Sequence, residues 1–500
     1  MTITSYGTGA YRAAKPSEFV STRSQFDDLQ RQLSTKQRSE TYGDLGIDRR
    51  TSLDINAKVS SIDSWLSGIQ LANVNLNLQT KSVENFAKLT NESRNDVVSN
   101  SYVPTSTGRS APQLLAEEKF KQTLDLLNIS SNGRYLFSGR TSDQEPVASY
   151  SEIMDGDATH AGLKTLISER QAADGITGMG RLTVAMPTTT TVAIGREAVN
   201  QSYGFNLTNA QTSSAAMAAT FNAGPPADVS VAVTGQPLPG DTLRIQLKLP
   251  DGTSEEVVLT ARAPGMTPVP ANSFEIGPNA ATTAINLRDT MTAALGKEAQ
   301  TTLRAASSSL TSLNFFESST SNPPDRIPAS LVNPPAAGTP ADTVIWYKGD
   351  DASDPARGTA SVQVDKNQIV GTGARANEQA FAVGLAQFAV LAIETFPAAD
   401  ANAQAGYEAM TDRVRTQLSY GGGVQKPAEI ITELGSAQTS LAQAKERHES
   451  TKNYLNTTLA GIENVTTEEV ATQILALQNQ LQASYQVTSL LSKLNLTNYL

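Results

Sequence analysis

Apolar residues near both ends of the chain recur at alternating steps of four and three, which is the spacing of one face of an α-helix. The stripe runs at the N-terminal end through Ile55, Val59, Ile62, Leu66 and Ile69, and at the C-terminal end through Val470, Ile474, Leu477 and Leu481. An apolar stripe of this length has to be buried against another surface. Both ends of the chain are therefore predicted to form long helices that need a partner.

Other helices are predicted beside these two. One follows the polar loop Tyr102–Ser110 and is predicted to end near Gly133, because glycine readily adopts the left-handed conformation of a C-terminal cap. Its predicted apolar positions are Leu114, Leu115, Phe120, Leu124 and Leu127. Helical spacing in the C-terminal part recurs in the stretches Phe381–Phe388, Tyr407–Leu418 and Ile431–Leu441.

Between the helical ends the sequence changes to a β-type pattern. The run Leu243–Leu249 alternates strictly between apolar and polar residues, and the turn pair Asp251-Gly252 separates it from the apolar run Val257–Leu259. This arrangement predicts a β-hairpin. The other predicted elements are strands near Phe274–Ile276, Val344–Tyr347 and Ser361–Val364, and a helix that is capped by Asn279, buries Ala284, Leu287, Met291 and Leu295, and stops at Gly296.

These patterns predict an α+β, multi-domain fold. The N- and C-terminal long helices pair as a coiled-coil-like bundle, and a β-rich domain is inserted between them. A chain of 500 residues also exceeds what one hydrophobic core usually organises. The predicted regions are an N-terminal polymerisation helix region (1–42), the N-terminal part of a helical core (43–145), a variable β-rich outer part (146–375), the C-terminal part of the core (376–464) and a C-terminal polymerisation helix (465–500).

The last helix has little chain beyond it that could cover its stripe. We therefore interpret it, together with the first helix, as a surface for neighbouring copies, whereas ordinary intramolecular core is the favoured interpretation of Ile55–Ile69. The candidate intersubunit residues are Phe26, Leu29, Leu33, Leu477, Leu481, Tyr485, Leu490, Leu491, Leu494, Tyr499 and Leu500. Thr466 and Glu469 form a capping box that begins the last helix.

The charge balance and the residue types argue against catalysis and nucleic-acid binding. With 39 Lys and Arg against 49 Asp and Glu the net charge is -10, which repels phosphate backbones and anionic membranes. The absence of cysteine excludes thiol catalysis and thiolate metal sites. His160 and His448 lie far apart and are interpreted as solvated, and Asp155-Gly-Asp157 is interpreted as a turn. No enzymatic activity, metal or cofactor is expected.

The segments Gly133–Asp143, Gly371–Glu378 and Leu481–Leu500 carry a resemblance to the hook-associated branch of the flagellin family, and the last of them looks like the C-terminal helix of hook-associated protein 3. The Asn498-Tyr-Leu500 ending is typical of that branch. Lys36–Gly46 departs from the family, which commonly has a glycine and a Ser-, Asp- and Pro-rich segment after Leu-Ser-Thr.

The resemblance implies an extracellular structural subunit at the junction between the hook and the filament of the bacterial flagellum. It implies export through the flagellar type III apparatus with a dedicated chaperone, and the N-terminus Met1–Ala10 lacks the pattern of a cleaved signal peptide. The implied partners are copies of the chain, a second hook-associated protein and flagellin, without nucleic acid or membrane insertion. Two alternatives stay open: a filament flagellin, and a surface adhesin or glycan-binding module carried by the middle region.

Overall fold

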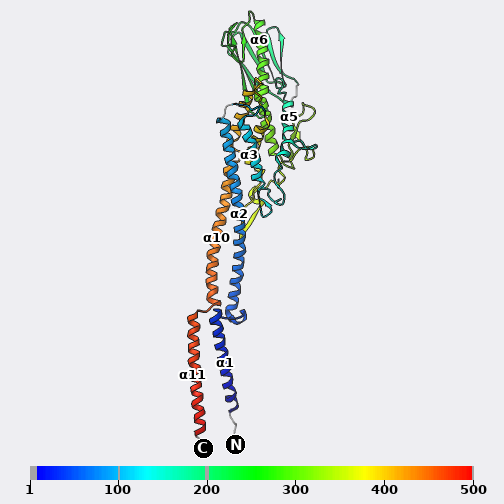
Figure 1. Ribbon diagram of the computed structural model, residues 1–500. Helices are drawn as coiled ribbons and strands as arrows, with labels where there is room; N and C mark the ends of the chain where they lie inside the picture. Colours follow the sequence, from blue (N-terminus) through cyan, green and yellow to red (C-terminus); the bar gives the residue numbers. More distant parts are fainter. Residues whose placement is uncertain (1–7, 100–101, 198–201, 498–500) are drawn as a thin grey trace. The chain divides into compact units, whose positions relative to one another are not determined.

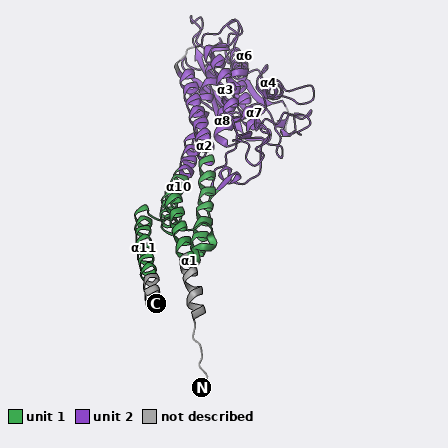
Figure 2. Ribbon diagram, turned by 60° about the horizontal axis from the view of Figure 1, so that its bottom comes forward, with its two compact units in different colours: residues 1–71, 363–370, 439–500 green, residues 72–362, 371–438 purple. Residues whose placement is uncertain are grey.

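The computed structural model describes residues 8–99, 102–197 and 202–497. The chain divides into two compact units (Figure 2). Unit 1 comprises residues 1–71, 363–370 and 439–500, and unit 2 comprises residues 72–362 and 371–438. Two long helices, α2 (Arg49–Ser99) and α10 (Pro427–Glu463), contribute residues to both units.

Unit 1 is built from helices that come from the two ends of the sequence (Figure 1). Its elements are α1 (Thr8–Thr35), the short helix η1 (Tyr42–Asp48), the first part of α2, the second part of α10, α11 (Thr467–Thr497), and most of the hairpin formed by β13 (Ser361–Asp365) and β14 (Gln368–Gly371). Within the unit α2 and α10 run antiparallel, because Ser52 contacts Glu463 and Asp63 forms an ion pair with Lys452.

The apolar stripe of α2 is core at three of its five predicted positions, whereas Val59 and Leu66 are half-buried. Ile55, Ile62 and Ile69 are buried on the face of α2 that carries the stripe. Further along the helix, in unit 2, the buried positions Leu76, Val83 and Phe86 continue the same spacing. The sequence therefore specifies one continuous seam along a helix of 51 residues.

Unit 2 contains a helical core around a helix that is buried on all sides. This helix, α8 (Gln379–Ile393), is buried from Ala380 to Ala392, which agrees with its almost wholly apolar sequence. It packs against α3 (Ala111–Leu127), α7 (Arg304–Glu317) and α9 (Ala403–Gln417), and its Phe381 ring lies beside the ring of Phe86 on α2. The helices α4 (Tyr150–Asp155) and α5 (Leu163–Asp174) complete the core.

Two four-stranded sheets, in which all but one of the strand pairs are antiparallel, form the β-rich part of unit 2. In the described residues one sheet has the strand order β3-β4-β7-β6 and the other the order β10-β9-β8-β5. The strands are β3 (Leu182–Thr188), β4 (Thr191–Arg196), β5 (Asn206–Thr212), β6 (Met217–Asn222), β7 (Asp228–Val233), β8 (Thr242–Lys248), β9 (Ser254–Arg262) and β10 (Ser273–Glu275), the last of which pairs parallel to β9. Helix α6 (Ala280–Glu298) packs against strands of both sheets and shares their core.

Several predicted elements of this region are confirmed. The hairpin β8–β9 pairs Leu243 with Leu259 and Ile245 with Val257, with Asp251-Gly252 in the turn. Asn279 caps α6, since its side chain accepts a hydrogen bond from the backbone N–H of Thr282 at 2.9 Å. The predicted apolar face of α6 is fully buried, and the strands near Phe274 and at Ser361–Val364 are present as β10 and β13.

Three local predictions are wrong. Helix α6 does not stop at Gly296, because burial of Ala299 and Leu303 keeps the chain helical through the π-helical stretch η2 (Ala299–Leu303) into α7. Gly133 is left-handed, with φ +73°, but it lies in the turn between β1 (Ser130–Ser131) and β2 (Arg134–Tyr135), whereas α3 ends at Leu127. Val344–Tyr347 is not a strand and makes only an isolated bridge to Val147.

The predicted face of α3 is also partly wrong. Leu114 and Leu115 are 42% and 48% exposed, while Ala116 and Phe120 are fully buried. At 100° per residue Leu114 and Leu115 lie off the helix face that carries the buried residues Ala116, Phe120, Leu124 and Leu127. The remaining short elements are β11 (Asp325–Arg326), β12 (Ala336–Ala337) and η3 (Ala356–Thr359).

The fold class predicted from the sequence is confirmed. The chain is α+β, with a β-rich part between helical ends, and helices α1 and α11 pack against each other. In Figure 1 these two helices lie side by side and lead to the two chain ends.

Three tyrosines of unit 2 that are buried or half-buried, Tyr150, Tyr347 and Tyr420, have raised pKa values. Burial raises the pKa of Tyr150 to about 12, with the nearby Glu117 carboxylate acting in the same direction. Burial also raises the pKa values of Tyr347 and Tyr420 well above that of an ordinary phenol. The hydroxyls of Tyr347 and Tyr420 donate hydrogen bonds to the carbonyls of Asp350 and Ala380, and ionisation would remove both bonds.

Unit 2 is therefore expected to lose stability as the pH rises above about 10. A phenol with a raised folded-state pKa holds its proton more tightly in the folded chain than in the unfolded chain, so its contribution is complete below the unfolded pKa and is lost as the pH rises through the folded pKa. Phenolate absorbance and helical circular dichroism recorded together test this, with Tyr420→Phe expected to weaken the pH dependence. Full phenolate formation with unchanged unfolding free energy would contradict the expectation.

Candidate assembly surface

The first and last helices meet through a small apolar cluster in unit 1. Leu29 of α1 and Val470 and Leu477 of α11 are its buried members, and Phe26, Val465 and Ile474 pack against them. Leu29 is 9% and Leu477 8% exposed, so both are largely covered within the chain. The structure thus brings together three of the predicted intersubunit residues, Phe26, Leu29 and Leu477, as contacts between the two terminal helices.

Backbone hydrogen bonds hold the start of α11 beside the end of α1. The N–H of Val465 donates to the carbonyl of Lys36 at 3.1 Å, and the N–H of Arg38 donates to the carbonyl of Glu463 at 2.7 Å. At the first turn of α11 the N–H of Glu469 donates to the hydroxyl of Thr466 at 3.2 Å, which satisfies one of the free donors of the helix. Both residues singled out as the helix cap therefore lie at the first turn.

Beyond this cluster, α11 exposes apolar side chains. Tyr485 is 58% and Leu490 60% exposed, Leu33 of α1 is 38% exposed, and Leu481 is partly buried. Leu475 and Val487, which were not predicted as intersubunit residues, are also exposed, at 61% and 55%. The side chains of Leu491 and Leu494, and the residues Tyr499 and Leu500, lie outside the described part of the structure.

Around Tyr485 the exposed surface of α11 is hollowed and uncharged. One shallow hollow is lined by Phe26, Gln478, Asn479, Leu481, Gln482 and Tyr485, and a second by Gln482, Tyr485, Gln486, Ser489 and Leu490. The sequence from Val470 to Ser492 contains no Asp, Glu, Lys or Arg. A neutral surface of amides, hydroxyls and aliphatic side chains can pack against a copy of itself without repulsion between like charges.

The two internal segments that carry the family resemblance contact each other in unit 2. Ser138 and Arg375 form an antiparallel bridge, the N–H of Gly139 donates to the carbonyl of Ala374 at 3.2 Å, and the N–H of Ala376 donates to the carbonyl of Phe137 at 2.8 Å. The Arg375 guanidinium also donates to backbone carbonyls nearby. The sequence indicated both segments but gave no signal that they pair, because they are far apart along the chain.

Gly139 shows why this contact needs glycine. Its φ is +65°, and a Cβ placed there would lie 2.8 Å from the Cβ of Asp350. The neighbouring Arg140 forms ion pairs with Asp350 and Asp354. These contacts fix the segment Gly133–Asp143 beside the segment Gly371–Glu378.

The two histidines differ in their surroundings. His160 lies in a turn, where its Nδ1 is 2.8 Å from Asp157. Backbone N–H groups of Thr159 and His160 donate to the same carboxylate and hold the pKa of Asp157 far below its ordinary value. The prediction that His448 is solvated is wrong: it is 5% exposed, its Nε2 lies 2.6 Å from the carbonyl of Val364, and its ring packs on Trp65. The hairpin β13–β14 covers it, which no local pattern could indicate.

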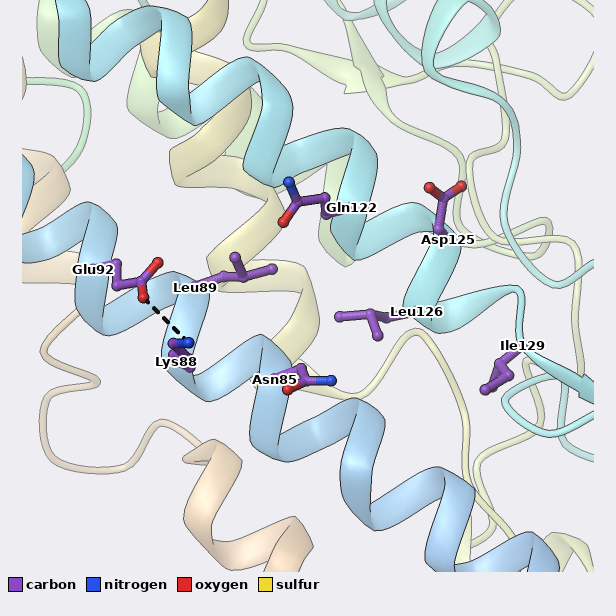
Figure 3. Close-up of a pocket in the computed structure, with 8 residues that line it drawn as sticks. All are labelled: Asn85, Lys88, Leu89, Glu92, Gln122, Asp125, Leu126 and Ile129. Atoms are coloured by element: carbon purple, nitrogen blue, oxygen red, sulfur yellow. Dashed lines mark ion pairs between the residues drawn. The ribbon is translucent and has the colours of Figure 1, made fainter.

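A groove in unit 2 lies between α2 and α3 (Figure 3). The side chains of Leu89 and Leu126 point toward each other across it, and Lys88 and Glu92 form an ion pair of 3.8 Å on its rim. The full lining is Asn85, Lys88, Leu89, Glu92, Gln122, Asp125, Leu126 and Ile129. This set contains amides, aliphatic groups and the charged side chains of Lys88, Glu92 and Asp125.

Metal-binding clusters and membrane-spanning helices are both absent from residues 8–99, 102–197 and 202–497. Within these ranges no group of three or more His, Asp or Glu side chains is placed to hold a metal ion. The helices of the same ranges include none that is both long enough and apolar enough to cross a bilayer.

The C-terminal helices are similar to a known protein family. Residues 424–500, which include the whole of α10 and of α11, match the family described as the bacterial flagellin C-terminal helical region. No match is found among curated proteins. The match supports membership of the flagellin family, whose members are structural proteins. The match is to the C-terminal helical region alone, and it supports a structural subunit of the bacterial flagellum.

Proposed function

We propose that this chain is a hook-associated junction subunit, which links the hook to the filament of the flagellum by helical self-assembly. The observation that carries the proposal is the flagellin-type C-terminal helical region, residues 424–500, with α11 paired to α1 and exposing further apolar side chains. The junction role itself is supported by the C-terminal sequence and its Asn498-Tyr-Leu500 ending.

In this proposal the terminal helices contact neighbouring copies through residues that are exposed or partly exposed in the α1–α11 pair. Leu33, Leu481, Tyr485 and Leu490 are the described candidates for these contacts. Leu491, Leu494, Tyr499 and Leu500 are proposed from the sequence alone. Phe26, Leu29 and Leu477 contribute by holding the two helices together, so that one joint surface is presented.

The copies would pack head to tail, since a contact between two different surfaces generates a helical array instead of a closed dimer. A second hook-associated protein would lie on the hook side, and flagellin would add on the other side. The β-rich part of unit 2 would form the outer surface. Export through the flagellar type III apparatus, with a dedicated chaperone, is part of the same proposal.

Electron microscopy of a strain that lacks this protein tests the proposal, with the culture medium assayed for secreted flagellin. We expect hooks without filaments and flagellin subunits lost to the medium, because filament subunits would have nothing to add onto. Complete hooks and junctions that lack only their major filament subunit would instead identify the chain as a filament flagellin. Normal filaments would overturn both assignments.

A further inference from the structure

We draw no further inference here: the strongest candidate, the partly apolar groove between α2 and α3 around Leu89, Leu126 and Ile129, carries nothing because nothing in the structure shows what covers it.

Discussion

Removal of residues 465–500 is expected to abolish incorporation of the chain into flagella while unit 2 keeps its fold. The deletion takes away α11, and with it Val470 and Leu477, which cover Leu29 of α1. It also removes the uncharged surface around Tyr485. Unit 2 consists of residues 72–362 and 371–438, none of which is deleted. Incorporation is measured by immunoblotting of purified flagella, and the fold of unit 2 by the thermal unfolding of the purified chain.

A point substitution tests the contact between α1 and α11 without removing the rest of α11. Leu477→Ala is expected to destabilise the α1–α11 contact by about 2 kcal/mol, the lower end of what removal of a buried leucine costs, because the cluster is small. Gln473→Ala on the exposed side of the same helix is the matched control. Equal incorporation of the truncated chain and the full chain would contradict the assembly role of α11. Equal losses of stability for Leu477→Ala and Gln473→Ala would contradict the role of Leu477 in pairing α1 with α11.

Replacement of Asp174 by alanine is expected to destabilise unit 2 by about 3–5 kcal/mol, the cost of leaving a buried charge without its partner. Asp174 at the end of α5 is fully buried. Its carboxylate accepts hydrogen bonds from Arg170 and Ser307, each at 2.7 Å, and from the backbone N–H of Gly204 at 2.8 Å. Removal of the carboxylate leaves the Arg170 guanidinium in a nearly closed site, so the loss exceeds that of a surface ion pair.

The matched control is the exposed pair Asp412–Arg415, which joins residues three apart on α9. Asp412→Ala is expected to cost less than about 1 kcal/mol, because surface ion pairs are weak. Denaturant unfolding followed by the fluorescence of Trp346, in a Trp65→Phe background, reports unit 2, since Trp346 is fully buried there. Similar losses for Asp174→Ala and Asp412→Ala would mean that the Asp174 cluster does not hold the unit together.

The sequence allowed prediction of those parts of the fold that depend on neighbouring residues. The hairpin β8–β9 was predictable because strict alternation and an Asp-Gly turn determine both its strands and its register. The cap at Asn279 and the buried seam of α2 were also predictable, because each depends on residues three or four positions apart in the same helix. The faces of short apolar runs were not, as Leu114 and Leu115 demonstrate, because a helix can rotate until a longer-range contact is satisfied.

The candidate assembly surface was predictable only in part. Periodicity identified α11 and its apolar positions, but it could not divide them between contacts with α1 and exposed residues, since that division depends on the distant Phe26 and Leu29. Burial of His448 and the contact between Ser138 and Arg375 also depend on segments far apart in the sequence. A single sequence carries no local signal for such contacts.

The central claim concerns where in the flagellum the chain lies, and immunogold electron microscopy of intact flagella tests it most directly. Antibodies raised against the whole chain are applied to wild-type cells, with the deletion strain as the control for specificity. We predict gold particles confined to a short band between the hook and the filament. Label along the whole filament would contradict the junction role and favour a filament flagellin, and absence of label from flagella would contradict the flagellar assignment itself.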